Sequence, residues 1–230
     1  MSQLALPLQL ADHAVFASFL DAGNETLVAT LAGIAGGEPG QGCWLWGGAA
    51  TGKTHLLQAV CDRAGDRSVY LPLAMLADAG PEMLEGLASR ELVCIDDADR
   101  VAGDETWELA LFNLFNDLQE AGGRLLIAAT TAPRECRFRL PDLASRMTRL
   151  PVFQVHALDE PQRVAALQLR ARHRGLELPD ETAGYLIKRS RRDMASLYGL
   201  LDKLDLEALR AQRRLTIPFV RDVLQQDPED

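Results

Sequence analysis

The chain has 230 residues, of which 47% are hydrophobic and 25% are charged, a composition that is typical of a folded protein and excludes a largely disordered one. Its 24 basic and 33 acidic residues give a net charge of −9, which disfavours a protein that coats nucleic acid by neutralising phosphates. No apolar run reaches the ~18 residues of a membrane-spanning helix, and the first twenty residues lack the pattern of a signal peptide. We therefore expect a cytoplasmic protein without a membrane partner.

Five short apolar runs alternate along the chain with stretches that are long enough for a helix. They follow a Gly/Pro-rich breaker at 36–40 and cover residues 43–46, 68–73, 92–95, 125–129 and 152–155. Each run is nearly continuous, which is typical of strands that are covered on both faces in a parallel sheet. The pattern predicts an α/β fold with a five-stranded parallel sheet.

The pattern becomes helical after residue 157. Pro161 suits the first turn of a helix, Asp193 and Thr216 suit N-cap positions, and Gly175 suits a helix end. Apolar residues recur at helical spacing at Met194, Leu197, Leu201 and Leu204. We predict three parts: an N-terminal tail over 1–22, an α/β domain over 23–156 and a small helical domain over 157–230.

Residues 47–54 fit the phosphate-loop pattern G-x-x-x-x-G-K-[ST] between an expected strand and an expected helix. Small residues let successive backbone N–H groups turn inward around phosphates, and the following helix adds its positive end. The residues assigned to the nucleotide are Gly47, Gly48, Ala49, Ala50, Thr51, Gly52, Lys53 and Thr54. Lys53 is expected to reach the β- and γ-phosphates, and Thr54 to hold Mg²⁺. The predicted ligands are therefore ADP or ATP with Mg²⁺.

Two further strand ends carry polar side chains. The run 92–95 ends at Asp96 and Asp97; we assign Asp96 to Mg²⁺ and Asp97 to orienting water, because a strand-end Asp supports the metal in phosphate-loop proteins. The run 125–129 ends at Thr130, which is expected either to sense the γ-phosphate or to cap the strand. The four cysteines and four histidines show no metal-ligand spacing, so no other metal site is predicted.

These motifs together resemble the AAA+ ATPases and, within them, the DnaA-related group of bacterial replication proteins. The phosphate loop continues with His55, the strand ending in Asp-Asp resembles a Walker B strand, and 143–146 resembles a Ser-Arg arginine-finger segment. The similarity extends to 140–146, 167–172 and 215–220. The resemblance implies an AAA+ core followed by a helical lid, with His55 counted among the nucleotide-binding residues.

The resemblance also implies a function, that of a regulator of DnaA. Such a protein meets ATP-bound DnaA on the beta sliding clamp of DNA polymerase III and promotes hydrolysis of DnaA's ATP, which prevents repeat initiation. Arg146 is then an arginine finger that acts in trans, although without the family match it reads as an ordinary surface arginine. The implied partners are DnaA, the clamp and, through the clamp, DNA; ADP-dependent self-association stays open.

The first residues resemble a short clamp-binding peptide. In such peptides a glutamine and spaced apolar residues enter a preformed groove, and here they are Gln3, Leu4, Leu6, Pro7 and Leu8. An edge strand, or a tail packed on its own domain, has a similar composition.

One position departs from the DnaA-like pattern. There an arginine at the start of the third lid helix contacts the nucleotide, whereas this chain has Ala195, with Arg191 and Arg192 out of register. We therefore expect the protein to hold ADP as a structural ligand and to turn over ATP poorly.

Two other functions stay open. An autonomous ATPase, such as a helicase loader, would couple its own turnover to helicase binding, and a small-molecule kinase would need several phosphate-facing lid arginines. The lid does carry Arg163, Arg170 and Arg174 on one helix face; we interpret them as a solvated face in preference to a contact with DnaA or DNA.

Overall fold

The structure is a computed structural model that describes residues 14–189 and 193–225. Its sheet contains β1 (Cys43–Trp46), β2 (Ser68–Pro72), β3 (Leu92–Asp96), β4 (Arg124–Ala129) and β5 (Val152–Gln154). The strands are all parallel and lie in the order β2-β3-β4-β1-β5. The predicted α/β class with a five-stranded parallel sheet is therefore confirmed. The predicted clamp-binding residues Gln3, Leu4, Leu6, Pro7 and Leu8 lie outside the described residues, as do Arg191 and Arg192.

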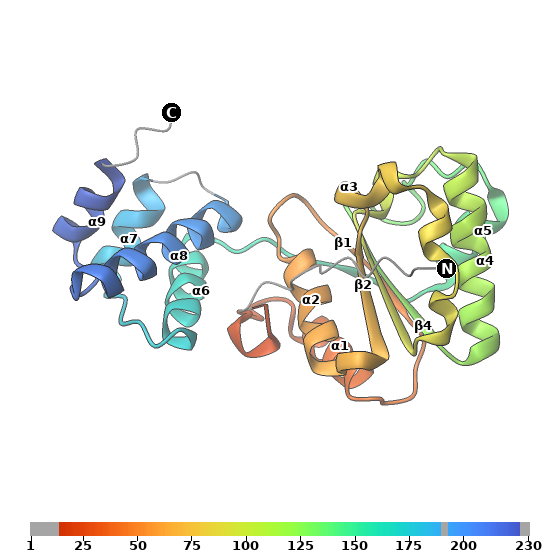
Figure 1. Cartoon of the computed structure of the whole chain (residues 1–230), viewed down its shortest axis with the longest axis horizontal. Helices are drawn as coiled ribbons and strands as arrows, with labels where there is room; N and C mark the ends of the chain where they lie inside the picture. The colour runs from red at the N-terminus through yellow and green to blue at the C-terminus, as the bar shows by residue number, and fades with distance from the viewer. Residues whose placement is uncertain (1–13, 190–192, 226–230) are drawn as a thin grey trace.

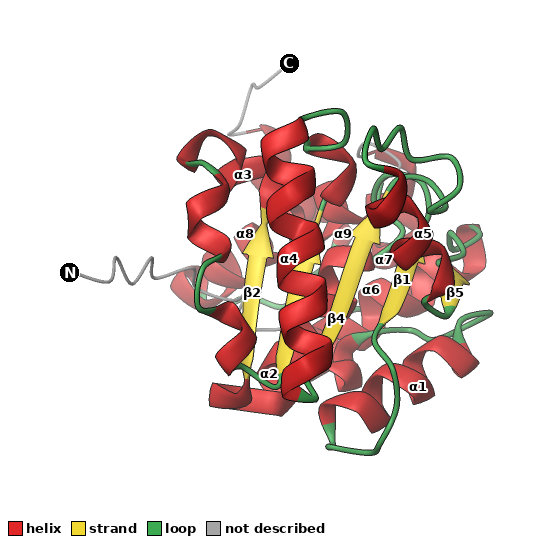
Figure 2. Cartoon of the chain, turned by 90° about the vertical axis from the view of Figure 1, so that its right-hand side faces the viewer, coloured by secondary structure: helices red, strands yellow, loops and turns green. Residues whose placement is uncertain are grey.

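Helices cover both faces of the sheet (Figures 1 and 2). Helices α1 (Glu25–Ala35) and α2 (Lys53–Ala64) lie on one face, and α3 (Leu73–Leu76), α4 (Glu105–Ala121) and α5 (Pro141–Arg149) lie on the other. Successive side chains of a strand point to opposite faces, so Val93 and Ile95 enter the core beneath α4, whereas Leu92 and Cys94 enter the core beneath α2. Burial on both faces explains why the strand sequences are continuously apolar. Strand β5, at the edge of the sheet, is not buried in this way, because Val152 is 43% exposed.

Short 3-10 helices complete the connections. They are η1 (Phe16–Ser18), η2 (Gly65–Arg67), η3 (Ala77–Ala79), η4 (Pro81–Leu84), η5 (Leu87–Ser89) and η6 (Ala98–Arg100).

Helix α4 has clear start and stop signals. Asp104 caps α4 by accepting hydrogen bonds from the N–H groups of Thr106 and Trp107, and α4 ends before Gly122, whose φ of 75° favours glycine.

The lid consists of α6 (Glu160–His173), α7 (Asp180–Arg189), α8 (Met194–Ala211) and α9 (Ile217–Gln225), which share an apolar core of their own. Pro161 lies in the first turn of α6, and Asp193 caps α8 through the Ser196 N–H at 2.8 Å. Gly175 follows α6 with a φ of 75°. Among the described helices, none is both long and apolar enough to span a membrane.

The arginine face of α6 is not solvated, and that prediction was wrong for two of its three members. The side chains of Arg170 and Arg174 are only 8% and 11% exposed, and both approach Asp202 of α8, at 3.6 and 2.9 Å. Arg170 also stacks on the Tyr198 ring, 4.4 Å from its centroid. These arginines therefore hold α6 against α8, because a charge in the lid interior needs an opposite charge beside it.

Gly42 precedes β1 at a point where the backbone of β4 is very close. A Cβ at this position would overlap the carbonyl oxygen of Leu125 and lie 2.8 Å from its nitrogen. We predict that Gly42→Ala lowers the free energy of unfolding by about 2 kcal/mol, because the neighbouring strand backbone cannot yield. Chemical denaturation measures this. Gly40→Ala is the matched control, since a Cβ at Gly40 meets open space; equal stability of the two variants would contradict the prediction.

Candidate functional site

The loop from β1 to α2 has two positions that only glycine fits. A Cβ on Gly47 would lie 2.7 Å from the Val155 carbonyl oxygen, and Gly52 combines a φ of +101° with a Cβ position 2.7 Å from the Phe19 ring. Gly48, Ala49 and Ala50 between them are exposed. The loop is thus fixed at both ends and offers its small central residues to a ligand, as phosphate binding requires.

Lys53 is the first residue of α2 and is only 7% exposed. Its Nζ donates hydrogen bonds to the carbonyl oxygens of Gly47 at 2.7 Å and Gly48 at 2.8 Å. Burial lowers the pKa of Lys53, and the nearby carboxylates, Asp96 first, act in the opposite direction. The loop therefore holds a cation at its centre, next to the first turn of α2, whose positive end attracts anions.

Asp96 ends β3 and is almost completely buried. Its Oδ2 accepts a hydrogen bond from the Tyr70 hydroxyl at 2.9 Å, and its Oδ1 accepts one from the Asp97 N–H at 3.0 Å. Burial, followed by the charge of Asp96, raises the pKa of Tyr70. Tyr70 therefore stays a hydrogen-bond donor that orients this carboxylate; sequence reasoning missed it, because nothing in 68–72 indicates that β2 lies beside β3.

Asp97 has a left-handed backbone with a φ of 54° and is half-buried. Burial is the main cause that raises the pKa of its carboxyl, followed by the charge of Asp96. A carboxylate with a raised pKa at a strand end is suited to handling water. Asp96 and Asp97 lie close enough to Lys53 for their charges to raise its pKa, so the structure brings the three residues together.

Thr130 contacts a residue that the sequence analysis did not consider. Its hydroxyl donates to Asp99 Oδ2 at 2.5 Å, and its N–H donates to Asp99 Oδ1 at 3.3 Å. Asp99 lies in η6, directly after β3. Thr130 is thus joined to the loop that carries Asp97. The acidic residues at 96, 97 and 99 are the feature of the sequence that could have indicated a role for Asp99.

The residues assigned to Mg²⁺, Thr54 and Asp96, lie at the start of α2 and the end of β3. Both offer oxygen atoms, which Mg²⁺ prefers, and Mg²⁺ usually takes its other ligands from phosphates and water. No group of three or more His, Cys, Asp or Glu in the described residues is arranged to hold a metal ion. The donor chemistry fits a magnesium ion that arrives with a nucleotide.

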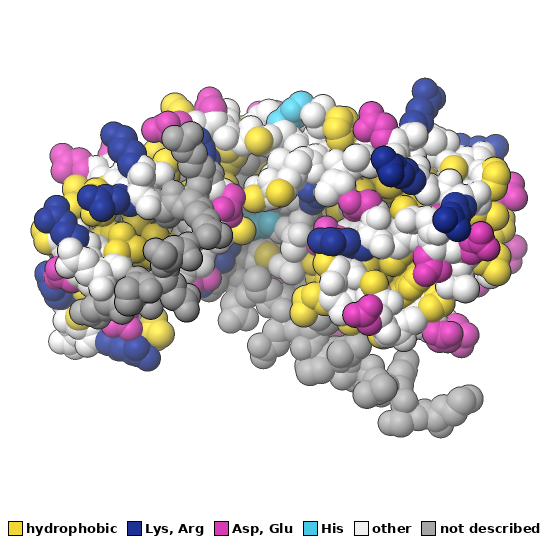
Figure 3. Space-filling view, turned by 90° about the horizontal axis from the view of Figure 1, so that it is seen from above, with side chains coloured by type: hydrophobic (Ala, Val, Ile, Leu, Met, Phe, Trp, Pro, Cys, Tyr) yellow, Lys and Arg dark blue, Asp and Glu magenta, His cyan; other side chains and the backbone are white. Residues whose placement is uncertain are grey.

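A pocket lies between the phosphate loop, the N-terminal segment and the lid, where the molecule narrows in the space-filling view (Figure 3). Its core side includes Phe19, Leu20 and Asn24, and its lid side includes Met194 and Tyr198. The surroundings are apolar and aromatic, as suits a flat base.

Asn24 also ties the lid connection to the core. Its side-chain Oδ1 accepts a hydrogen bond from the His156 N–H at 2.9 Å, and its Nδ2 donates to the His156 carbonyl oxygen at 3.4 Å. Asn24 therefore both lines the pocket and holds His156, the residue directly before the lid.

His55 links α2 to the segment that precedes α1. Its Nε2 lies 2.9 Å from the Val15 carbonyl oxygen, and its ring lies 5.4 Å from that of Phe19. Burial is the main cause that lowers the pKa of His55, and the charges of Arg170 and His173 add to it. His55 lines the pocket, beside Gly52 of the phosphate loop.

Ala195 is exposed in the first turn of α8. Met194 in the same turn and Tyr198 at the start of the next turn line the pocket instead. At this point the described part of the lid presents an apolar and an aromatic side chain to the pocket.

Arg146 lies in the last turn of α5 and is half-buried. Its guanidinium lies 6.0 Å from the centroid of the Phe115 ring of α4, and no carboxylate of the described residues forms an ion pair with it. In Figure 1, α5 lies on the side of the sheet away from α2 and the lid. The structure therefore separates Arg146 from the helix that begins with Lys53.

Comparison with protein families decides the affiliation of the chain. Residues 10–150 match the model of the bacterial DnaA ATPase domain, which is more than half of the chain. The chain belongs to the bacterial DnaA ATPase-domain family. Residues 159–224 match the model of the Hda lid domain. The predicted resemblance is thus confirmed: this is an Hda-like, DnaA-related AAA+ protein.

Solved structures support the same fold for this DnaA-family chain. Domain III of DnaA from Thermotoga maritima is 21% identical with a TM-score of 0.75, covering 94% of this chain and 97% of that one. AMPPCP-bound DnaA from Aquifex aeolicus is 21% identical with a TM-score of 0.70, covering 88% and 68%. The RuvB branch migration motor of Thermotoga maritima is 19% identical with a TM-score of 0.64, covering 88% and 69%.

Proposed function

We propose that this protein inactivates DnaA. In this proposal it binds ADP or ATP with Mg²⁺, is held on the DNA-loaded beta sliding clamp by residues 3–8, and stimulates hydrolysis of DnaA-bound ATP through Arg146. The product, ADP-bound DnaA, no longer initiates replication. The DnaA-type ATPase domain and the Hda-type lid support the broad role of a DnaA-related regulator.

The nucleotide site supports the first part of the proposal. Lys53, at the centre of a loop of small residues, is suited to the phosphates, and Thr54 and Asp96 are suited to Mg²⁺, which would neutralise phosphate charge. The pocket bordered by Phe19 and Tyr198 is suited to the base. DnaA of Aquifex aeolicus, which has this fold, has been solved with AMPPCP bound.

The observation that carries the proposal is the location of Arg146. Its helix, α5, lies across the sheet from α2, which follows the chain's own phosphate loop. Its guanidinium contacts the face of the Phe115 ring, and no carboxylate among the described residues forms an ion pair with it. A cation in this location is better placed for the phosphates of a neighbouring molecule than for those of its own nucleotide. An arginine supplied in this way stabilises the charge that develops on the transferred phosphoryl group.

Ala195 supports a passive role for the protein's own nucleotide. Of the described residues at the start of α8, Met194 and Tyr198 line the pocket and Ala195 is exposed, so this position offers no cation that could respond to a γ-phosphate. We expect purified protein to retain ADP and to hydrolyse ATP slowly. Rapid hydrolysis without DnaA and clamp would instead favour an autonomous ATPase such as a helicase loader.

A reconstituted assay tests the proposal: conversion of DnaA-bound ATP to ADP is followed with clamp loaded on DNA. The wild-type chain is expected to stimulate conversion, and Gln3→Ala/Leu4→Ala is expected to lose both clamp retention and about 10²-fold of the stimulation, because tethering raises the local concentration of the two proteins. Gln9→Ala, outside the motif, is the matched control. A tail variant that leaves the clamp yet stimulates fully would refute the role of the tail, and absence of stimulation by the wild type would refute the function.

A further inference from the structure

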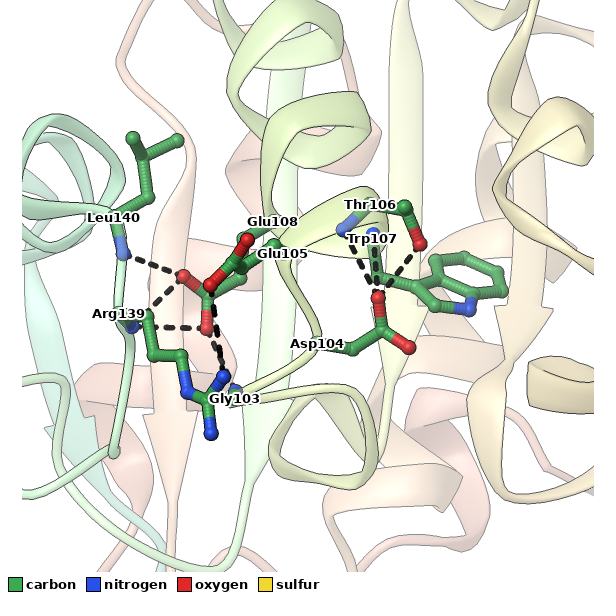
Figure 4. A network of polar contacts seen from close by, with 8 residues as sticks. All are labelled: Gly103, Asp104, Glu105, Thr106, Trp107, Glu108, Arg139 and Leu140. Atoms are coloured by element: carbon green, nitrogen blue, oxygen red, sulfur yellow. Dashed lines mark hydrogen bonds and ion pairs between the residues drawn. The ribbon is translucent and has the colours of Figure 1, made fainter.

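Glu108 is a carboxylate in the first turn of α4 with no exposed surface. It accepts four hydrogen bonds, all from backbone N–H groups (Figure 4). Oε1 accepts from Gly103 at 2.6 Å and from Arg139 at 3.0 Å; Oε2 accepts from Arg139 at 2.8 Å and from Leu140 at 2.6 Å. Both oxygens are therefore engaged, and a buried carboxylate with so many partners fixes the backbone around it.

Two of these donors lie directly before α5. Leu140 is the N-cap residue of α5 and provides no side-chain cap, and Pro141 follows in the first turn. The first turn of a helix leaves N–H groups unpaired and favours a negative charge nearby. No side chain of α5 itself caps its start, and the Glu108 carboxylate on α4 accepts hydrogen bonds from the backbone there instead.

The same helix also supports the far end of α5. Phe115, whose ring lies beneath the Arg146 guanidinium, is seven residues after Glu108 on α4 and so lies on the same face of that helix. Helix α4 thus fixes the backbone directly before α5 through Glu108 and contacts the last turn of α5 through Phe115.

The rest of the connection from β4 to α5 is also fastened. The Trp44 indole N–H donates to the Thr131 carbonyl oxygen at 3.0 Å, and the Trp44 ring meets Phe138 edge to face, 6.2 Å between centroids. With Thr130 bonded to Asp99, the chain is held at 130–131, at 138 and at 139–140. The contact made by Glu108 is the last of these before the helix that carries Arg146.

We propose that Glu108 is the positioning residue for Arg146: it fixes the backbone of residues 139 and 140 so that α5 presents the guanidinium in one orientation. This rests on the proposed function, because it concerns the same stimulation of DnaA. Loss of the anchor lets the start of α5 shift, and a displacement of about 1 Å at a reacting group lowers a rate by about 10²-fold. Glu108 itself touches neither nucleotide.

Glu108→Gln tests this role, since it keeps the size of the side chain but turns one acceptor oxygen into an NH₂ group that faces N–H donors. The rate of DnaA-bound ATP hydrolysis at saturating concentration is expected to fall by about 10²-fold, with an unchanged half-saturating concentration and unchanged clamp and ADP binding. Hydrogen exchange at the amides of Arg139 and Leu140 is expected to accelerate. The control is Glu105→Gln, three residues earlier on α4, where the carboxylate is exposed and lies 3.5 Å from the Arg139 guanidinium.

A second variant keeps the test valid if Glu108→Gln does not fold, as judged by its thermal midpoint. Leu140→Pro removes one donor at a φ of −82°, close to the value of about −65° that proline fixes, and is expected to lower the saturated rate in the same way. A wild-type rate in either folded variant, or a loss that appears only in the half-saturating concentration, would overturn the positioning role. If Arg146→Ala itself stimulates normally, the proposed function fails instead.

Discussion

Arg146→Ala is expected to lower the stimulated hydrolysis of DnaA-bound ATP by about 10³-fold or more, because an arginine supplied in trans is worth about 10³ to 10⁵ in rate in other NTPases. The fold should not suffer, since the main contact that is lost is with the Phe115 ring, worth about 0.5–1 kcal/mol for a partly exposed pair. Single-turnover conversion of labelled ATP on DnaA, with clamp-loaded DNA, measures the effect. ADP binding and clamp retention are expected to be unchanged.

Arg149→Ala is the matched control for this substitution. Arg149 lies in the same last turn of α5 and is exposed, so its removal changes the net charge equally. It is expected to retain stimulation. Arg146→Lys is expected to be intermediate, because an ammonium keeps the charge but not the planar fork of donors. Full activity of Arg146→Ala would exclude the finger, and an equal loss in Arg149→Ala would indicate general electrostatic attraction instead.

The strands could be predicted from the sequence because each is buried on both faces. Val93 and Ile95 enter one core and Leu92 and Cys94 enter the other, so the run contains no polar position to confuse it with an exposed segment. The prediction is least accurate at β5, where an edge location leaves Val152 exposed. The run of apolar residues thus indicates how buried a strand is, and the burial of a strand depends on its position in the sheet.

The phosphate loop could also be predicted, because its geometry requires particular residues in sequence order. Gly47 and Gly52 are imposed by the contacts with Val155 and Phe19, and Lys53 must follow to start α2. Although these contacts are tertiary, the residues that they require are consecutive in the sequence, so the motif can be recognised without knowing the contacts.

The supporting polar residues could not be predicted, because each acts across a tertiary contact. Tyr70 reaches Asp96 from the neighbouring strand, Asp99 reaches Thr130 across 31 positions, and Glu108 reaches the backbone before α5 across 31 and 32 positions. The prediction that the arginine face of α6 is solvated was wrong for the same reason, because Asp202, which pairs with Arg170, lies on another helix. Side-chain type alone does not reveal a partner that the fold supplies.

Lys53→Ala is expected to weaken ADP binding by about 10²-fold, since hydrogen bonds from a charged donor contribute about 1.5–3 kcal/mol and about 1.4 kcal/mol is tenfold in affinity. A second cause acts in the same direction: without the Lys53 ammonium, the charges of Asp96 and Asp97 repel the phosphates uncompensated. Calorimetric titration with ADP and Mg²⁺ measures the loss.

Lys188→Ala is the control for this change, because Lys188 is exposed on α7 of the lid. It removes the same charge and is expected to bind ADP as the wild type does. If Lys53→Ala retained wild-type affinity, the loop would not be the phosphate site, and the hydrogen bonds from Lys53 Nζ to Gly47 and Gly48 would serve only to stabilise the turn. If instead ADP binding is lost while clamp retention persists, stimulation of DnaA by this variant reports directly whether the protein's own nucleotide must be bound for Arg146 to act.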